Sequence, residues 1–332
     1  MRPNMTGVAG VSCMLAMVAG AGGALAQDVT YSGGDKVTVL MGFAPGGGSD
    51  TLAQLVQPLL AEELGGVSFV NQYQPGATGA IAWTQLAKQV KPDGQTISIT
   101  NTPMLMTNYI MNDAITYSID ELDPIANIVT DPGIVVVNPD SKFTDFNQLV
   151  EEAKANPGTV TVGNSGVGGD DFFTSILLEQ NAGVQFQKVP FKGDGPSWTA
   201  AMGGKIDASF NNVGITYPQI AEGNLRPLVV FAEERLAELP DVPTAKELGF
   251  DIVSGSSRGY SAPKGLPAEA KQQLVDAMTR VVERPEFKEA AAKQAMNVDF
   301  IAGDDYAAFL KAQEEEFRGV WDSVKDDYEA TK

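Results

Sequence analysis

The fold can be worked out from the stretch FAPGGGSD, residues 43–50, where one hydrophobic pattern ends and another begins. The preceding run KVTVLMG (36–42) has the composition of a buried strand, and the following TLAQLVQPLLAEEL (51–64) has the 3.6-residue period of an amphipathic helix. A glycine-rich turn between strand and helix brings backbone N–H groups and the positive end of the helix dipole to one point, which suits an anion. A tight turn without a ligand is the alternative interpretation of the same residues.

The alternation of strand and helix patterns continues along the chain. It runs through VSFVNQY (67–73), GAIAWTQLAKQV (79–90) and TISIT (96–100), and it restarts after NIVTDPGIVVVNPD (127–140). The segment VTVGNSGVGGDD (160–171) again combines a β-run, a glycine-rich loop and the start of a helix. This pattern predicts an α/β protein of two similarly built lobes, each a mixed, mostly parallel sheet flanked by helices. The acidic helical segments at 266–287 and 306–328 are expected to pack back onto the first lobe.

The segment that precedes Gln27 differs from the rest of the chain. Arg2 is followed by the apolar, small-residue run VAGVSCMLAMVAGAGG (8–23) and by Ala24-Leu25-Ala26, which is typical of a signal-peptidase site. We therefore expect an export signal cleaved after Ala26. A membrane-anchored N-terminus is the first alternative, and a lipoprotein at Cys13 is the second, although Gly10-Val11-Ser12 fits a lipoprotein signal poorly.

Composition excludes several kinds of chemistry. The chain has no histidine, and its single cysteine, Cys13, lies in the predicted signal, so a mature chain would lack the usual triad base, a thiolate nucleophile and cysteine-ligated metal. Without Arg2, 22 basic and 42 acidic side chains give a net charge of −20. Such a surface disfavours nucleic acid and anionic membranes as partners.

Nucleotide binding is disfavoured at the first glycine loop. A P-loop would end in Gly-Lys-Ser or Gly-Lys-Thr, and GGGSD contains no lysine. A dinucleotide-binding fingerprint needs a third glycine at the Gly-x-Gly-x-x-Gly spacing, which Gly46, Gly47 and Gly48 do not continue.

Four further segments with ligand-binding chemistry follow predicted strands. They are NQYQPGATGA (71–80), NSGVGGDD (164–171), FKGDG (191–195) with Lys192, and the pair Asn211-Asn212. Open α/β sheets bind ligands beyond the carboxyl ends of their strands, so we expect these segments to face one cleft.

The chain also resembles a known family. The segments FAPGGGSDTLAQ, PGATGAIA, VKPDGQTI, DPIANIV, LPDVPTAKELG and SAPKGLP, taken in order over nearly the whole mature chain, resemble the Bug/TctC family of periplasmic solute-binding proteins of tripartite tricarboxylate transporters. The resemblance implies a periplasmic receptor without enzymatic activity or cofactor. Its two lobes, joined by a two-strand hinge, would close over a small di- or tricarboxylate and present it to the membrane components of the transporter. We expect residues 1–26 as signal, 27–130 and 254–332 as lobe 1, 131–253 as lobe 2, and a monomer.

The resemblance also implies which residues meet the ligand. One ligand carboxylate would be held by the two loops of the first lobe, partly through ordered water. Asp50 would cap its helix or order a water, because its own carboxylate would repel the ligand's. The expected ligand-binding residues are Phe43, Ala44, Gly47, Ser49, Asp50, Gly76, Ala77, Thr78, Thr102, Ser165, Gly166, Gly168, Asp170, Lys192, Gly193, Asn211, Asn212 and Arg258.

Two places depart from the family pattern. Phe172-Phe173 follow Asp170-Asp171 where family members often have histidine, and they could make that wall of the cleft apolar. Arg258 stands where many members have an aromatic residue nearby. An arginine there could grip a second carboxylate with two parallel N–H bonds, or it could be a surface residue of a loop.

Two other functions remain open on sequence alone. Asp50, Asp170 and Asp171 could hold Mg²⁺ or Ca²⁺ in a hydrolase or lyase, although acidic residues at a helix start more often cap it. A receptor that signals to a membrane sensor kinase would need the same pair of lobes as a transport receptor.

Overall fold

A computed structural model of the chain describes residues 1, 30–43, 45, 48–191 and 193–330. The predicted signal at 1–26 therefore lies, apart from Met1, outside the described residues. The strands are β1 (Lys36–Met41), β2 (Ser68–Tyr73), β3 (Thr96–Thr102), β4 (Leu122–Val137), β5 (Thr161–Asn164), β6 (Gln187–Pro190), β7 (Ala208–Asn212), β8 (Arg226–Phe231), β9 (Gly255–Pro263) and β10 (Val298–Ala302). The helices are α1 (Gly48–Glu63), α2 (Ala80–Gln89), α3 (Met104–Met111), α4 (Phe146–Ala155), α5 (Asp170–Ala182), α6 (Asp194–Met202), α7 (Val213–Ala221), α8 (Ala268–Glu283), α9 (Pro285–Lys293) and α10 (Gly303–Ala330).

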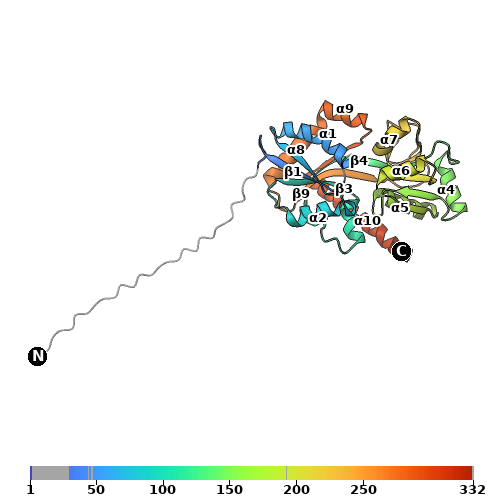
Figure 1. Ribbon diagram of the computed structural model, residues 1–332, viewed down its shortest axis with the longest axis horizontal. Helices are drawn as coiled ribbons and strands as arrows, with labels where there is room; N and C mark the ends of the chain where they lie inside the picture. Colours follow the sequence, from blue (N-terminus) through green and yellow to red (C-terminus); the bar gives the residue numbers. More distant parts are fainter. Residues whose placement is uncertain (2–29, 44, 46–47, 192, 331–332) are drawn as a thin grey trace.

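One long strand runs through both halves of the molecule. The strand order is β2-β1-β3-β9-β4-β7-β5-β6, and β8 and β10 also pair with β4. The start of β4 pairs with β9 and β10, whereas its end, from Gly133 to Val137, pairs with β7 and β8. The outer pairs β1–β2, β1–β3, β5–β6 and β5–β7 are parallel, and the pairs of β4 and β9 are antiparallel. This confirms the predicted α/β fold class, with β4 and β9 as the two connecting strands (Figure 1).

The first half consists of β1–β3, α1–α3, α8, α9 and β10, and hydrophobic cores cover both faces of its sheet. One core joins α1, α8 and α9 to the sheet; the other joins α2, α3 and the start of α10. Helix α1 buries Leu52, Val56 and Leu60, which recur every four residues as the helical period requires. These cores hold the carboxyl ends of β1 and β3, and hence the loops that follow them.

The second half, β5–β8 with α4–α7, has cores of its own. Helices α4 and α5 pack on one face of the sheet around Phe146 and Phe210, and α6 and α7 cover the other face around Val230. The end of β4 supplies both cores, because its valines and Ile134 alternate between the two faces. The two halves thus share a strand, and each keeps its own hydrophobic interior.

Helix α10 contacts both halves, which differs from the packing expected from the sequence. Its start contributes Tyr306 and Leu310 to a core of the first half. Further along, Phe317 and Trp321 pack with residues of α5, so the helix spans the junction. In Figure 1 this helix emerges at the lower edge of the molecule, between the two halves, and the chain ends below α5. Among the described residues, none of the helices combines the length and the apolar composition needed to cross a lipid bilayer.

Candidate functional site

The described part of the first glycine loop is held against the sheet by its flanking residues. Phe43 is half-buried, and its ring packs edge-on against Trp83 with 6.2 Å between ring centroids. Ser49, in the first turn of α1, is buried and donates its hydroxyl to Asn101 Oδ1 at 2.9 Å. Ala44 and Gly47, two of the expected ligand-binding residues, lie outside the described residues. The loop ends at the N-terminus of α1, whose unpaired N–H groups and dipole favour an anion.

Asp50 connects α1 to the neighbouring strand. Its carboxylate accepts hydrogen bonds from Tyr73 Oη at 2.5 Å and from Gln54 Nε2 at 2.9 Å. The side chain is buried, so these hydrogen bonds stabilise its negative charge and hold α1 against β2. Both of these donors are side chains, so the expected role of Asp50 in capping its helix or ordering a water stays a prediction.

The second loop of the first half lies beside the first and has a strained backbone. Gly76, Ala77, Thr78 and Gly79 all have positive φ, which residues with a β-carbon adopt at a cost of order 1–3 kcal/mol each. A β-carbon on Gly42 would lie 2.8 Å from Gly79 Cα, so the two loops touch backbone to backbone. Such strain persists only where surrounding structure enforces it, and it concentrates at ligand sites.

In the second half, the loop that follows β5 is stabilised by Asp171. The carboxylate of Asp171 accepts hydrogen bonds from the backbone N–H and the hydroxyl of Ser165, the latter at 2.9 Å. Gly166 and Gly168 have positive φ, and the backbone N–H of Gly193 donates to Ser165 O at 3.0 Å. The loops after β5 and β6 therefore meet. Lys192 lies outside the described residues.

Among the described residues, a direct hydrogen bond joins helix α3 of the first half to the glycine loop of the second half. Thr107 Oγ1, on α3, donates to Gly168 O at 2.7 Å, and both atoms belong to a buried contact. A β-carbon on Gly168 would lie 3.4 Å from Met111 Sδ, also on α3. The glycine loop of the second half thus faces the helix that follows β3 of the first half.

Arg258 lies at the centre of this arrangement, on the connecting strand β9. Its side chain is only 7% exposed, and Nη1 contacts Asp131 Oδ2 at 3.3 Å, which is a long ion pair. Among the described residues this is its only hydrogen bond, although a guanidinium has five donors. A β-carbon on Gly48 would lie 2.7 Å from Arg258 Nε, so the guanidinium fits against the start of α1 only because residue 48 is glycine.

The partner of Arg258 is itself bound by the second half. Asp131, on β4, is buried and accepts a hydrogen bond from the backbone N–H of Gly214 at 2.9 Å, in the first turn of α7. Asn212 Nδ2 donates to Asp131 O at 3.1 Å and to Asp170 Oδ2 at 2.7 Å. Residues of α1, both connecting strands, α5 and α7 therefore meet around one buried polar cluster.

Two of the expected residues face elsewhere or lack a partner. Asn211 alternates with Asn212 along β7, and its amide donates to Ser209 Oγ at 2.5 Å on the opposite face, beside Ser197 of α6. Its buried Oδ1 has no hydrogen-bond partner among the described residues. The same holds, within the described ranges, for the buried hydroxyl of Thr102 at the end of β3. Neither side chain joins the Arg258 cluster through a hydrogen bond in the described part of the chain.

Burial makes the carboxyl groups of this region weak acids. The pKa of Asp170 rises to about 6, because burial outweighs the hydrogen bond from Asn212 and the charge of Arg258. Asp194, the first residue of α6, has a pKa raised to about 7 by burial and by the charge of Asp170. Burial also raises the pKa of Asp131 and, more strongly, that of Asp171. These groups influence one another, so the region behaves as a coupled set of acids around one guanidinium.

The chemistry that this arrangement supports is binding. The described residues include no histidine or cysteine, and no three of their metal-ligating side chains are arranged to hold a metal ion. A buried guanidinium that makes a single hydrogen bond to the described residues, next to the N-terminus of a helix and a strained glycine loop, can instead accept an anionic group.

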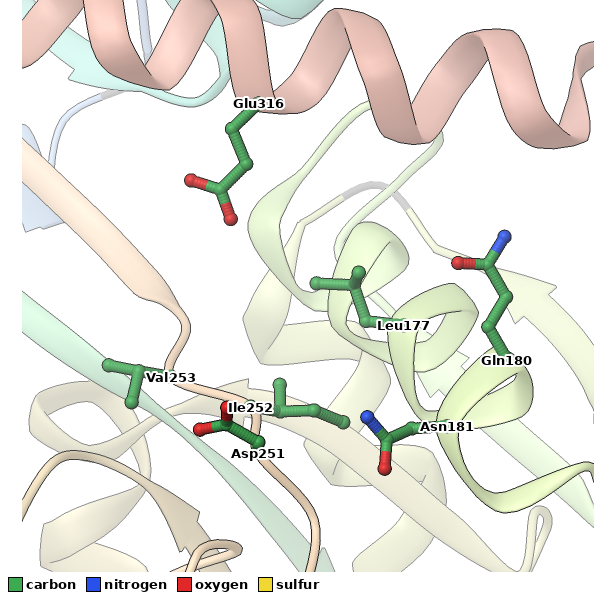
Figure 2. Close-up of a pocket in the computed structure, with 7 residues that line it drawn as sticks. All are labelled: Leu177, Gln180, Asn181, Asp251, Ile252, Val253 and Glu316. Carbon is green, nitrogen blue, oxygen red and sulfur yellow. The ribbon is translucent and has the colours of Figure 1, made fainter.

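A separate cavity of about 290 Å³ lies away from these loops (Figure 2). It opens between the far end of α5, the segment Asp251–Val253 before β9, and Glu316 of α10. Asp170 begins α5, whereas Leu177, Gln180 and Asn181 at the cavity are near its end. The cavity is therefore not the space between the glycine loops.

One expectation for the cleft wall is wrong. Phe172 and Phe173 are buried in a cluster with Phe317 and Trp321 of α10, and the rings of Phe173 and Phe317 are 5.2 Å apart. They anchor α10 because the helix period turns them away from Asp170 and toward the junction. Residues that sequence reasoning missed are Asn101, Thr107, Asp131 and Asp194. Only Asp194, next to the predicted Lys192-Gly193 turn, had a local signal.

Comparison with known proteins assigns the chain to a family. A family model described as "Tripartite tricarboxylate transporter family receptor" matches residues 52–322. The UPF0065 protein in the gbd 5′ region of Cupriavidus necator is 31% identical over 274 residues, and the match covers 82% of each chain. Protein BugT of Bordetella pertussis is 27% identical over 320 residues, and the match covers 96% of this chain and 97% of BugT.

Among solved structures, MatC from Rhodopseudomonas palustris with bound malate has a TM-score of 0.77 and 25% identity, covering 86% of this chain and 98% of MatC. The family and its solved members are solute-binding proteins and not enzymes. The chain thus belongs to the TctC family of solute-binding receptors, those of the tripartite tricarboxylate transporters.

Proposed function

We propose that the protein is a periplasmic receptor that captures a small di- or tricarboxylate between its two halves and delivers it to the membrane components of a tripartite tricarboxylate transporter. The observation that carries this proposal is Arg258, a buried guanidinium beside the first glycine loop that makes one hydrogen bond to the described residues. Family membership and the malate bound to MatC support a carboxylate as the ligand. Export would rest on residues 1–26, which act as a cleaved signal in this proposal.

Two subsites would hold the ligand. One carboxylate would meet the loops after β1 and β2, where Ser49 and Thr78 are placed, and the N-terminus of α1. A second carboxylate would meet Arg258, whose guanidinium makes a single hydrogen bond, from Nη1 to Asp131, to the described residues. The separation between the subsites would set the ligand length that the cleft accepts.

Binding would be coupled to closure of the halves. We propose lobe boundaries at residues 130/131 and 253/254, with β4 and β9 as the hinge strands. Closure would then rotate one half relative to the other, and each half would keep its own hydrophobic core. The contact between Thr107 and Gly168 would form when the lobes close. The closed form would be the one that the transporter recognises.

A thermal-shift panel tests the ligand class. Mature protein would be heated with citrate, malate, succinate, adipate and aromatic diacids, and a ligand at 100 times its dissociation constant adds about 2.7 kcal/mol of stability. Domains of this size gain about 2–4 °C per kcal/mol, so the expected shift is roughly 5–10 °C. A panel in which every acid leaves Tm unchanged contradicts the proposed ligand class. Thr78→Ala should reduce the shift for the ligand without lowering the Tm of the empty protein by more than about 1 °C.

A further inference from the structure

Helix α3, which follows β3 in the first half, presents two consecutive side chains to loops of different halves. Thr107 Oγ1 donates to Gly168 O at 2.7 Å, in the glycine loop of the second half. Asn108 Nδ2 donates to Thr78 O at 3.0 Å, in the second loop of the first half. One short helix therefore holds a loop of each half.

The contact of α3 with the second half is a close one. A β-carbon on Gly168 would lie 3.5 Å from Thr107 Oγ1 and 3.4 Å from Met111 Sδ. Residues 107 and 111 are four apart and therefore lie on one face of the helix. Gly168 also has a φ of +94°, which residues with a β-carbon rarely adopt. Beside it, Val167 packs against the same hydrophobic cluster as Ile110 and Met111, so polar and apolar contacts both join α3 to this loop.

The contact of α3 with the first half supports a strained backbone. Thr78 has φ 51° and ψ 43°, a left-handed conformation that is uncommon for threonine. Asn108 binds the carbonyl of Thr78, and its Nδ2 also donates to Tyr117 Oη at 3.4 Å. The hydroxyl of Tyr117 in turn donates to Leu105 O of α3 at 2.8 Å. The strained loop is therefore bound to the same helix that contacts the second half.

Helix α3 is anchored within its own half. Leu105 and Met106 are fully buried in a core of the first half, and Tyr109 Oη donates to Glu314 Oε1 of α10 at 2.8 Å. Energetic coupling between distant sites is carried by packed side chains, hydrogen bonds and rigid secondary elements, and α3 combines all three. The position of the Thr78 loop and the position of the Gly168 contact are therefore linked through one helix.

Resting on the proposed function, we propose that α3 couples the order of the ligand loop at Thr78 to closure of the two halves, with Thr107 and Asn108 as positioning residues. A ligand carboxylate bound by the loop after β2 holds Thr78 in its strained conformation, and Asn108 then fixes α3. Thr107 is thereby placed to donate to Gly168 O, and this bond stabilises the closed form.

The two residues act on different steps of binding. The bond from Thr107 to Gly168 joins the halves, so it belongs to the closed form. In an open form the threonine hydroxyl can turn to water or to the carbonyl of Pro103, four residues back. Loss of this bond should therefore speed dissociation of the ligand. The bond from Asn108 to Thr78 lies within one half and is present before the ligand binds, so its loss should slow association.

Stopped-flow tryptophan fluorescence and calorimetric titration test this division. The probe is whichever of citrate, malate, succinate and adipate raises the Tm of the wild type most. Thr107→Val keeps the side-chain shape without the donor and should raise Kd about 5- to 100-fold through faster dissociation, because a buried carbonyl loses its donor. The Tm of the empty protein should change by less than about 2 °C. Thr107→Ser retains the hydroxyl and should keep Kd within about threefold of the wild type.

A double-mutant cycle tests whether the two contacts are linked. Asn108→Ala should raise Kd about 2- to 10-fold through slower association. The double variant should lose less affinity than the product of the single losses, by about threefold or more, because an α3 that no longer holds Thr78 presents Thr107 less precisely. Thr84→Val makes the same exchange on α2 of the same half, and it should leave Kd unchanged and combine multiplicatively with Thr107→Val.

The possible outcomes are distinct. A double variant whose loss equals the product of the single losses overturns the coupling through α3. A lower Tm of empty Thr107→Val with an unchanged dissociation rate shows a purely structural contact and overturns the proposal as well. If Thr107→Val does not fold, as judged by circular dichroism, Met111→Ala weakens the same contact with Gly168 and should speed dissociation instead. Failure of every acid to bind the wild type rejects the proposed function itself, whereas binding with unchanged kinetics in the variants rejects only the coupling.

Discussion

Replacing Arg258 by methionine should destabilise the protein in a way that depends on pH. Methionine fills a similar volume and leaves Asp131 buried, 4% exposed, without its cation. Breaking a buried ion pair by removing one partner costs about 3–5 kcal/mol, because the remaining charge is uncompensated. Asp131 retains the hydrogen bond from Gly214 N, so we take the lower end, about 3 kcal/mol at pH 8. With about 2–4 °C per kcal/mol, Tm should fall by roughly 6–12 °C.

The pH dependence follows from the direction of the pKa shift. Burial already raises the pKa of Asp131 in the wild type, so the folded state binds more protons than the unfolded state, and stability falls as pH rises through the shifted pKa. Loss of Arg258 raises the pKa of Asp131 further and also those of Asp170 and Asp194, which the guanidinium lowers. The loss of stability should therefore be small at pH 5 and reach its full size at pH 8.

Thermal and urea unfolding of four proteins at pH 5 and pH 8 measures this effect. They are the wild type, Arg258→Met, Asp131→Asn and the double variant, which form a double-mutant cycle. The double variant contains no unpaired charge at this position and should recover most of the stability lost in Arg258→Met at pH 8. A loss below about 1 kcal/mol at pH 8, or a loss that is equal at both pH values, would refute the assignment of Arg258 and Asp131 as a buried, coupled pair.

Three further predictions concern the loops and α10. Ser49→Ala should weaken ligand binding, which isothermal titration measures. It should also lower stability by about 1–3 kcal/mol, measured by thermal melting, because the buried amide oxygen of Asn101 loses its donor. Gly79→Ala should lower the free energy of unfolding, measured by chemical denaturation, more than Gly34→Ala does. Both glycines have positive φ, but of the two only residue 79 would place a β-carbon 2.6 Å from a tryptophan ring. Equal losses would show that backbone strain alone matters. Trp321→Ala should cost about 3–5 kcal/mol and lower the unfolding temperature of both halves, and a separate transition of the second half alone would contradict the packing of α10 across the junction.

The loops were predictable because their signals are local. The glycines at 46–48 come directly after a strand pattern and directly before a helical period, so the turn could be predicted without tertiary information. The same holds for the loop after β5. Where the structure describes these loop positions, a close backbone approach or a positive φ requires glycine there. A run of glycines in the sequence indicates such a backbone directly.

The Arg258 cluster depended on contacts between distant segments. Asp131 and Arg258 are 127 residues apart. The sequence marked Arg258 as a candidate ligand-binding residue or a loop residue, but it gave no sign that Arg258 lies on a buried strand or that Asp131 is its partner. The pairing arises because β9 inserts between β3 and β4, which no local pattern indicates. For the same reason Asn101, the register partner of Arg258 on β3, was not identified as the acceptor for Ser49.

The misplaced phenylalanines show how a local departure can be misinterpreted. Phe172 and Phe173 stand where family members often have histidine, which suggested a place in the wall of the cleft. A helix turns its side chains by about 100° per residue, so neighbours of a ligand-facing residue point elsewhere. Their partners, Phe317 and Trp321, belong to α10, the last helix of the chain, which was expected to pack on the other half.

The position of β9 in the sheet also has a consequence for the order of events during synthesis. β9 is the last of the central strands to be made and begins at Gly255, yet it lies between β3 and β4, which are complete by Val137. The first half therefore cannot close its core while the ribosome is still translating the second half. Contacts of such long sequence separation form slowly, because a large loop must be closed before they contribute any stability. The segment from β1 to β4 should thus remain protease-sensitive in the nascent chain until β9 has emerged, and a stalled chain that ends before Gly255 would reveal this.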